Sequence, residues 1–414
     1  MLVLPFLSGC SAGDPEQKPV LNPSPKEQWG KTMFGNDGTI FAYPDLYVNY
    51  WGYTWRTKED GHDNIALCIK GIFPKARFFS FSLYDDELGE AIGGFADNEI
   101  VPDSGSVNPF VEESSAENRF TVYIVPSGVS EDKISKLSSS NICRLKEGVE
   151  QATVIMREYL GIDEYGGCEL PSIHAIDLGT MKEVAAPLRM DSNVVSFPVN
   201  YSHLWSDENK DVPFFLAPRG AYYPNNSTDY LYGRTILTDD QVLVFSFLPV
   251  PLPKSVPEYK SAPARYWSIC FGSARDTHSY YSVYDGQAEV PDGKKCTFVV
   301  CMKQNSRSEE IRNKVKTEKA KGKCVELIEW DRQRKSVEGK EIGDCIVILY
   351  RNILPDRSWE YSIARMTPTP YGDPVNKSKD DPDKMIAHRA LGDYGPYGFK
   401  YSAAEFLDEG ILFP

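Results

Sequence analysis

The sequence predicts a mainly β protein made of two tandem, duplicated, antiparallel β-sandwich-like domains with a few peripheral helices. The first reason is a motif that occurs twice in the same order. Residues 76–81 (ARFFSF) return as residues 264–269 (ARYWSI), and residues 99–103 (EIVPD) return as residues 289–292 (EVPD). The offset between the first pair of copies is 264 − 76 = 188 residues, which is the length of a domain and exceeds any solenoid repeat.

The second reason is that both copies keep the same alternation of side chains. Alternate residues of a strand share one face. Counted from the arginine of each motif, positions +2, +4 and +6 are Phe79, Phe81 and Leu83 in one copy and Trp267, Ile269 and Phe271 in the other. We therefore expect each copy to be a strand with one apolar face.

The third reason is the arrangement of predicted strands around each motif. A run rich in β-forming residues that ends at proline precedes each copy, and another run follows it. These flanking runs are residues 64–74 and 119–125 in the first copy, and 241–251 and 296–302 in the second. The short connections leave no room for crossover helices, so we expect antiparallel pairing within domains at 31–195 and 196–414.

Two segments are predicted to be helical. Residues 146–160 place Val149, Met156 and Leu160 near one helical face, which indicates a helix packed on a sheet. The basic run at 312–323 follows acidic residues and is typical of a solvated helix. The chain carries 45 basic and 59 acidic residues, a net charge of −14, and lacks a basic face with interleaved aromatics. This composition argues against nucleic-acid binding.

The amino terminus predicts export and a lipid anchor. Residues 1–9 form a short apolar leader before Cys10, and a polar, proline-rich stretch follows to about residue 30. This arrangement resembles a bacterial lipobox, in which Cys10 would carry the lipid and residues 10–30 would form a flexible tether. No Lys or Arg precedes the apolar run. The alternatives are a plain cleaved signal or a free amino-terminal cysteine. The expected location is the cell envelope or the extracellular surface, with the lipid in the membrane.

Eight cysteines remain after Cys10, an even number that fits an oxidising compartment. Eight cysteines allow 105 pairings, so the sequence does not define connectivity. Our preferred intradomain disulfides are Cys143 with Cys168 and Cys270 with Cys296. None of the cysteines forms a CxxC motif, which argues against a zinc site.

The acidic loop of the repeated motif has two interpretations. Asp97 and Asp103 offer oxygen ligands of the kind that calcium prefers, but acids in such loops more often cap turns. Arg77 and Arg265 begin equivalent strands, and each is predicted to form a structural ion pair with an acid of its own domain, such as Asp97 or Glu99.

Catalytic motifs are scarce. Residues 9–13 satisfy the pattern G-x-S-x-G but lie between a leader and a tether, where no nucleophile elbow can form. The five histidines are scattered, without HExxH spacing. We therefore predict no catalytic residue and no cofactor, and enzymatic activity is not favoured.

Aromatic residues are the remaining signal. Tyr and Trp gather at 43–55, 201–205, 221–233 and 393–401. Such rings can form a stacking platform for a sugar or another small ligand. The alternative is that these rings cover the ends of a sandwich. If a contact surface exists, the candidates are Tyr222, Tyr223, Tyr230 and Trp205.

The segments PKARFFSFSLYDD, FADNEIVPDSGSVNPF, APARYWSIC, YRNILP and LGDYGPYGFKYSAAEF, taken in order, resemble a family of exported proteins, chiefly bacterial, with a duplicated β domain and no assigned activity. The resemblance implies the fold and supplies no catalytic residue. We expect a surface-anchored, non-catalytic binding module whose partner is a glycan, a small molecule or a surface protein. The alternatives are an assembly subunit of a surface complex, or an enzyme whose site is not visible in the sequence.

Overall fold

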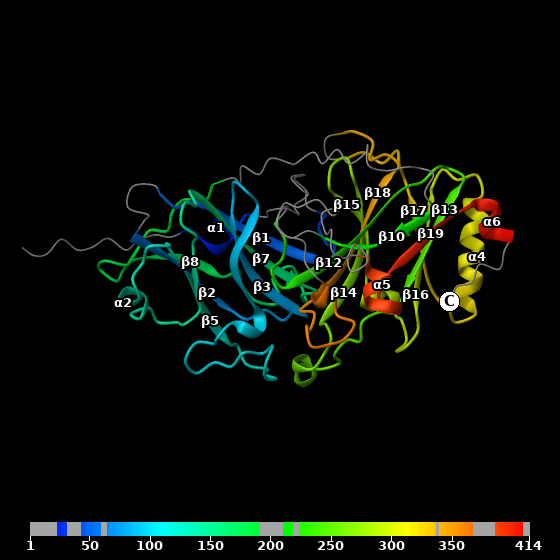
Figure 1. Ribbon diagram of the computed structural model, residues 1–414. Coiled ribbons are helices and arrows are strands. Elements are labelled where there is room, and N and C mark those ends of the chain that lie inside the picture. The colour runs from blue at the N-terminus through cyan, green and yellow to red at the C-terminus, as the bar shows by residue number, and fades with distance from the viewer. Residues whose placement is uncertain are drawn as a thin grey trace, which may run out of the picture.

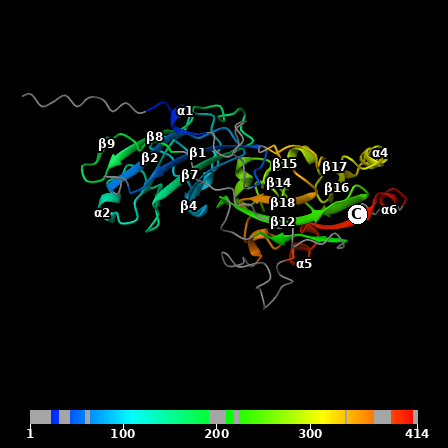
Figure 2. The ribbon, with the colours of Figure 1, turned by 90° about the horizontal axis from the view of Figure 1, so that it is seen from above.

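The computed structural model describes residues 23–30, 43–58, 64–190, 210–217, 223–336, 339–366 and 386–408. Two β domains lie side by side, the first drawn from blue to green and the second from green to red (Figure 1, Figure 2). The predicted boundary between residues 195 and 196 and the predicted lipidation site at Cys10 lie outside the described residues. Among the described residues, no helix has the length and apolarity needed to cross a membrane.

Domain 1 is a sandwich of two sheets. Sheet A has the strand order β1-β7-β3-β4, and sheet B has the order β6-β5-β2-β8-β9. The strands are β1 (Val48–Arg56), β2 (Ile65–Ile72), β3 (Phe78–Asp85), β4 (Glu90–Ala96), β5 (Arg119–Val125), β6 (Ile142–Arg144), β7 (Gln151–Tyr159), β8 (Ser172–Asp177) and β9 (Lys182–Val184). All pairs are antiparallel except β5 with β6.

Domain 2 repeats this arrangement. Sheet D has the order β11-β12-β18-β14-β15, and sheet C has the order β10-β19-β13-β16-β17. The strands are β10 (Asp211–Pro213), β11 (Phe215–Leu216), β12 (Thr228–Ile236), β13 (Gln241–Phe247), β14 (Tyr266–Ser273), β15 (Ser279–Tyr284), β16 (Cys296–Met302), β17 (Cys324–Trp330), β18 (Cys345–Ile353) and β19 (Tyr397–Ser402).

The duplication predicted from the sequence is confirmed strand by strand. The order β1-β7-β3-β4 matches β12-β18-β14-β15, and β6-β5-β2-β8 matches β17-β16-β13-β19. The exceptional parallel pair, β5 with β6, recurs as β16 with β17. Arg77 donates its backbone N–H to the carbonyl of Tyr159 at 2.9 Å, and Arg265 donates to the carbonyl of Ile353 at the same distance. The two arginines therefore occupy equivalent positions.

The predicted apolar faces form the two sandwich cores. Phe79, Phe81 and Leu83 pack with apolar residues of sheet B in domain 1. Trp267, Ile269 and Phe271 pack in the same way against sheet C in domain 2. The opposite faces of β3 and β14 turn toward the junction of the domains, where Phe78, Tyr84 and Tyr266 share a third apolar cluster with residues of both domains.

The helices are short and peripheral, as predicted. They are α1 (Pro25–Gln28), α2 (Glu131–Ile134), α3 (Asp285–Ala288), α4 (Ser308–Ala320), α5 (Ala387–Leu391) and α6 (Ala403–Asp408). The 3-10 helices are η2 (Asp97–Glu99), η4 (Val256–Lys260), η5 (Ile363–Arg365) and η8 (Gly392–Tyr394). Helices α4 and α6 cover the outer face of sheet C, where Ile311, Val315 and Phe406 pack on Val299. The helix predicted around the basic run is therefore present, but one of its faces is buried on sheet C.

The helix predicted over residues 146–160 is wrong, because this segment contains β7. Every residue of β7 is buried, since sheet B covers one face and the domain junction covers the other. A strand buried on both faces has apolar residues at consecutive positions and loses its period of two. Its pattern can then imitate the face of a helix.

Candidate functional site

The segments that enter the first long strand of each domain are exchanged between the domains. Tyr43, before β1, donates its backbone N–H to the carbonyl of Thr277 in domain 2 at 2.7 Å. Tyr223, before β12, donates to the carbonyl of Gly89 in domain 1 at 3.2 Å. Both tyrosines have a positive φ, 49° and 52°. We call residues 43–47 and 223–227 the exchanged arms.

A buried arginine holds each exchanged arm. Arg157 of β7 donates from Nη2 to the carbonyl of Tyr223 at 2.8 Å. Arg351, at the equivalent place in β18, donates to the carbonyl of Tyr43 and to the Cys270 thiol. Both guanidinium groups are buried. A carbonyl facing a buried guanidinium makes a charge-assisted hydrogen bond, so each arm is fixed by the other domain.

The polar side chains of the arms are also bound across the junction. The Asp45 carboxylate accepts hydrogen bonds from the Tyr266 hydroxyl at 2.8 Å and from the Ser268 hydroxyl at 2.5 Å. Burial and the Asp45 charge raise the pKa of Tyr266 well above its usual value, so the phenol stays protonated and donates. In the other arm, Asn225 donates to the Tyr159 hydroxyl at 3.4 Å.

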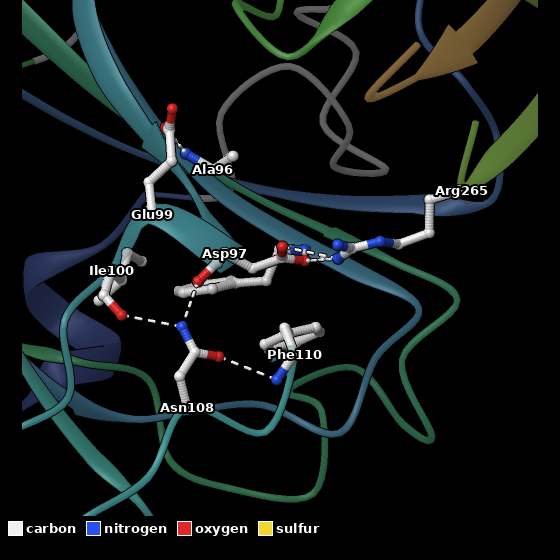
Figure 3. Close-up of polar contacts among 8 residues, drawn as sticks. Ala96, Asp97, Glu99, Ile100, Asn108, Phe110 and Arg265 are labelled. Atoms are coloured by element: carbon white, nitrogen blue, oxygen red, sulfur yellow. Dashed lines mark hydrogen bonds and ion pairs between the residues drawn. The ribbon is translucent and has the colours of Figure 1, made fainter. Parts of the chain in front are cut away.

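Two ion pairs also cross the junction, and each joins an arginine of one domain to an aspartate of the other. The prediction that each arginine pairs with an acid of its own domain is therefore wrong. Nη1 of Arg265 lies 2.6 Å from both carboxylate oxygens of Asp97 (Figure 3). Arg77 binds Asp285 in the opposite sense. Asp97 and Asp285 are equivalent, since each accepts the backbone N–H two residues after the arginine of its own domain, from Phe79 and Trp267.

The acidic loop around Asp97 is held by hydrogen bonds between its own residues. Asn108 donates from Nδ2 to the carbonyls of Asp97 and Ile100 at 2.6 and 2.8 Å, and it accepts the Phe110 N–H at 2.9 Å (Figure 3). Glu99 accepts the Ala96 N–H at 2.8 Å. Burial raises the pKa of Asp97 to about 6, opposed by Arg265. The Asp97 carboxylate therefore remains ionised at pH 7.

The two calcium candidates have other partners. A guanidinium occupies both oxygens of Asp97 and would repel a cation. Oδ2 of Asp103 accepts the Thr121 hydroxyl at 3.1 Å. Within the described ranges, no group of three or more acidic, histidine or cysteine side chains is arranged to hold a metal ion.

The two preferred disulfides are not formed, because all eight described cysteines are free thiols. Cys143 pairs with Ile124 in sheet B, whereas the Cys168 thiol donates to the Ile72 carbonyl, at the far end of β2. Cys270 faces the domain junction and receives Arg351, while Cys296 lies in the sandwich core. Cys143 and Cys168 therefore lie near opposite ends of β2. Cys270 and Cys296 are separated by a sheet, since one faces the junction and the other faces the core.

Two of the four predicted ligand contacts, Tyr223 and Tyr230, are described, and both lie at the domain junction. Tyr223 is 4% exposed, and its hydroxyl donates to the Asp86 carboxylate at 3.0 Å. Tyr230 is half-buried, and its hydroxyl accepts the Asn225 N–H at 3.1 Å. Tyr222 and Trp205 lie outside the described residues. Both described tyrosines therefore contribute to the junction between the outer faces of sheets A and D, and not to the end of a sandwich.

A different group of rings lies at the surface of domain 2, and we call Trp359, Tyr361 and Tyr394 the aromatic cluster. The rings of Tyr361 and Tyr394 stack with centroids 4.9 Å apart and an interplanar angle of 24°. The Trp359 ring stands almost perpendicular to Tyr394, with centroids 4.8 Å apart. Trp359 and Tyr394 pack on the core of domain 2, while Tyr361 is 37% exposed.

Sequence reasoning noted Tyr394 within an aromatic run but missed Trp359 and Tyr361. These two residues lie in the loop after β18, whereas Tyr394 lies in η8 before β19. The residues WEY at 359–361 were the only local signal. The cluster combines a ring pair anchored on a core with an outer ring that faces solvent, which is an arrangement that can accept a flat ligand.

One buried acid stands apart from these sites. Glu158 of β7 is 1% exposed, and its Oε1 has no hydrogen-bond partner in the described part of the chain. The loop containing Gly161 and Gly166 closes directly over its carboxyl group. Burial, with a smaller contribution from Asp163, raises the pKa of Glu158 to about 8. This carboxyl group is therefore mostly protonated at neutral pH.

The chain matches no protein-family model and no curated protein sequence. The crystal structure of an uncharacterised protein from Burkholderia cenocepacia is similar over 89% of this chain and 80% of that chain, with 9% identity and a TM-score of 0.46.

Proposed function

We propose that the protein is an exported lipoprotein of the cell surface that acts as a non-catalytic binding module, and that the aromatic cluster contacts a sugar ring of its ligand. The observation that carries this proposal is the stacked pair Tyr361–Tyr394, anchored on the core of domain 2 by Trp359. This contact surface lies in the loop after β18 and in η8, apart from Tyr223 and Tyr230 at the domain junction.

The chemistry of the cluster suits a carbohydrate. One face of a pyranose ring carries C–H groups, which stack on aromatic rings, while its hydroxyl groups need polar partners at the rim. Asp393 meets this requirement. It directly precedes Tyr394, its side chain is exposed, and its Oδ1 lies 3.0 Å from Nζ of Lys295. The Asp393–Lys295 pair offers an acceptor and a donor beside the rings.

The rigid attachment of the cluster favours binding. Ligand stacking costs less free energy when the rings are already held in place. Trp359 and Tyr394 contact each other and the core, so only Tyr361 must be ordered further. The leader and Cys10 supply the anchoring part of the proposal, since a lipid at Cys10 followed by a tether would present the domains away from a membrane.

A glycan array tests the binding site directly. The full-length chain with Cys10→Ser is compared with the same chain carrying Tyr361→Ala or Tyr361→Phe. A stacking contribution of about 1 to 1.5 kcal/mol predicts roughly tenfold weaker binding for Tyr361→Ala and little change for Tyr361→Phe. Tyr165→Ala is the control, because Tyr165 is a half-buried tyrosine that stacks on another ring, Trp51, in domain 1 and away from the aromatic cluster.

The competing role is assembly with a surface protein. If no glycan binds, and cross-linking on intact cells recovers one stoichiometric protein partner, the ligand-binding proposal is replaced by the assembly role. Mass spectrometry of protein from its native membrane tests the anchor separately. A lipid mass on Cys10 with no preceding peptide is expected, and an unmodified terminus elsewhere would remove the anchor.

A further inference from the structure

Two of the free cysteines face each other across a strand pair. Cys296, the first residue of β16, is the register partner of Cys324, the first residue of β17, and the two strands run parallel. Neighbouring strands lie about 4.8 Å apart. This spacing lies within the Cα separation of roughly 4.4 to 6.8 Å that a disulfide spans.

Both thiols lie on the same face of sheet C. Along β16, Phe298 and Val300 lie two and four residues after Cys296 and pack in the sandwich core. Along β17, Ile328 lies four residues after Cys324 and packs in the same core. Because alternate residues share a face, the side chains of both cysteines point to the core side of the sheet. Cys301 has the opposite parity and packs toward α4.

The surroundings distinguish the two thiols. Cys296 is fully buried and Cys324 is half-buried, at the edge of sheet C. Burial raises the pKa of Cys296, and smaller contributions come from Glu326 and Cys324, which places the second thiol in its immediate environment. Lys294 and Lys319 oppose the rise in the pKa of Cys324. Cys324 is therefore the thiol that an external reagent can reach.

We infer that Cys296 and Cys324 form a disulfide when the protein meets an oxidising compartment, so that sheet C carries an intradomain modification site. Formation of this disulfide in the cell depends on the proposed export, whereas the geometry of the site does not. The bond would join β16 to β17 and close a loop of 324 − 296 = 28 residues that contains α4.

The reaction is a thiol–disulfide exchange with a protein or glutathione disulfide as the oxidant. The Cys324 thiolate attacks the oxidant, forms a mixed disulfide and releases one reduced thiol. The Cys296 thiolate then attacks the Cys324 sulfur and releases the second thiol. Two protein thiols are oxidised to one disulfide, one oxidant disulfide is reduced to two thiols, and the protons of the protein thiols pass to the released thiolates.

Trypsin makes the product easy to recognise, because Lys295 and Lys323 directly precede the two cysteines. The reduced full-length protein is equilibrated with reduced and oxidised glutathione, its free thiols are alkylated, and it is digested without reductant. We expect peptide 296–303 linked to peptide 324–332, with fragmentation showing Cys301 alkylated. We also expect a rise in Tm of about 5 °C over the reduced protein.

Matched variants separate the site from general thiol oxidation. Cys324→Ser should abolish both the linked peptide and the rise in Tm, whereas Cys168→Ser, which also replaces a half-buried thiol, should leave both unchanged. Recovery of Cys296 and Cys324 as two alkylated thiols under oxidising glutathione overturns the inference.

The same digest on protein from native cells distinguishes this inference from the proposed export. A linked peptide there supports both. A linked peptide in glutathione buffer with two alkylated thiols in native protein supports the site and counts against export to an oxidising compartment.

Discussion

Asp97 of domain 1 and Arg265 of domain 2 form a buried ion pair in which one guanidinium nitrogen lies 2.6 Å from both carboxylate oxygens. The two side chains are 0% and 4% exposed. The counterpart pair, Arg77 with Asp285, contains an arginine that is 33% exposed. Duplicated residues therefore make the same contact in two different environments, and this difference allows a controlled experiment.

Arg265→Met should lower the free energy of unfolding by about 3 to 5 kcal/mol, because it leaves the Asp97 carboxylate buried without its counter-ion. Arg77→Met should cost less, roughly 1 kcal/mol, since the Arg77 side chain is already 33% exposed to solvent. Urea unfolding of both variants measures the difference. Adding Asp97→Leu to Arg265→Met should recover much of the loss, and equal losses in the two single variants would contradict the assignment.

Glu158→Gln should stabilise the protein increasingly as pH rises. The pKa of Glu158 is about 8 in the fold, above the ordinary glutamate value of 4.5. The native state therefore keeps a proton that the unfolded chain loses, so this group's contribution to stability is present below pH 4.5 and is lost as pH rises through 8. The variant should match wild type near pH 4 and exceed it by a few kcal/mol at pH 8 to 9. Thermal unfolding at several pH values measures this gap. A gap independent of pH would show that Glu158 does not titrate in this range.

Gly272→Ala should disturb the packing of the first exchanged arm, residues 43–47, and lower the stability of the protein. A Cβ at this position would overlap the ring of Tyr43 and would lie 2.6 Å from the His278 carbonyl oxygen. Overpacking of this kind costs about 1 to 3 kcal/mol. Gly128→Ala is the control, because nothing lies within 4 Å of its Cβ position. Denaturant midpoints of the two variants should therefore separate, and identical midpoints would mean that the Tyr43 ring moves aside freely.

Tyr223→Ala should act on stability, not on ligand recognition. The ring packs against Tyr84 with centroids 4.9 Å apart, and its truncation should cost about 3 to 5 kcal/mol, as for other large aromatic side chains. Tyr223→Phe removes the hydroxyl group that donates to Asp86 and should cost about 1 to 2 kcal/mol. Tyr361→Ala, on the surface, should stay within about 0.5 kcal/mol of wild type. Calorimetry of the three variants gives the ranking, and a stable Tyr223→Ala protein would reverse it.

Strand patterns and the repeat were enough to predict the fold class and the duplication, because alternation reports which face of a strand is buried. The partner of each arginine was not predictable in the same way. Arg77 could bind Asp97 within its own domain or Asp285 in the other, and both arrangements use the same residue types at the same register. Only the placement of the second domain selects between them.

The cysteines and the aromatic cluster show a related limit. Cys270 and Cys296 are near in sequence, but strand parity and the sheet place one at the domain junction and the other in the core. The sequence does not indicate Cys324 as a partner of Cys296, because the parallel pairing of β16 with β17 has no local signature. Trp359 and Tyr394 are 394 − 359 = 35 residues apart and meet only through tertiary packing.

The exchanged arms also affect the order in which the two domains can finish folding. The outer side of β3 and β7 is covered by residues 223–227, yet the last strand of domain 1 ends at Val184. A chain that emerges from a ribosome or a translocation pore does so from its amino terminus. All strands of domain 1 are then available for folding before Tyr223 emerges, and until it does, Arg157 and Tyr84 lack the arm that covers them. During that interval domain 1 exposes the surface that the arm later covers, and the same arm of a neighbouring chain carries the same residues, which is the situation that favours domain swapping.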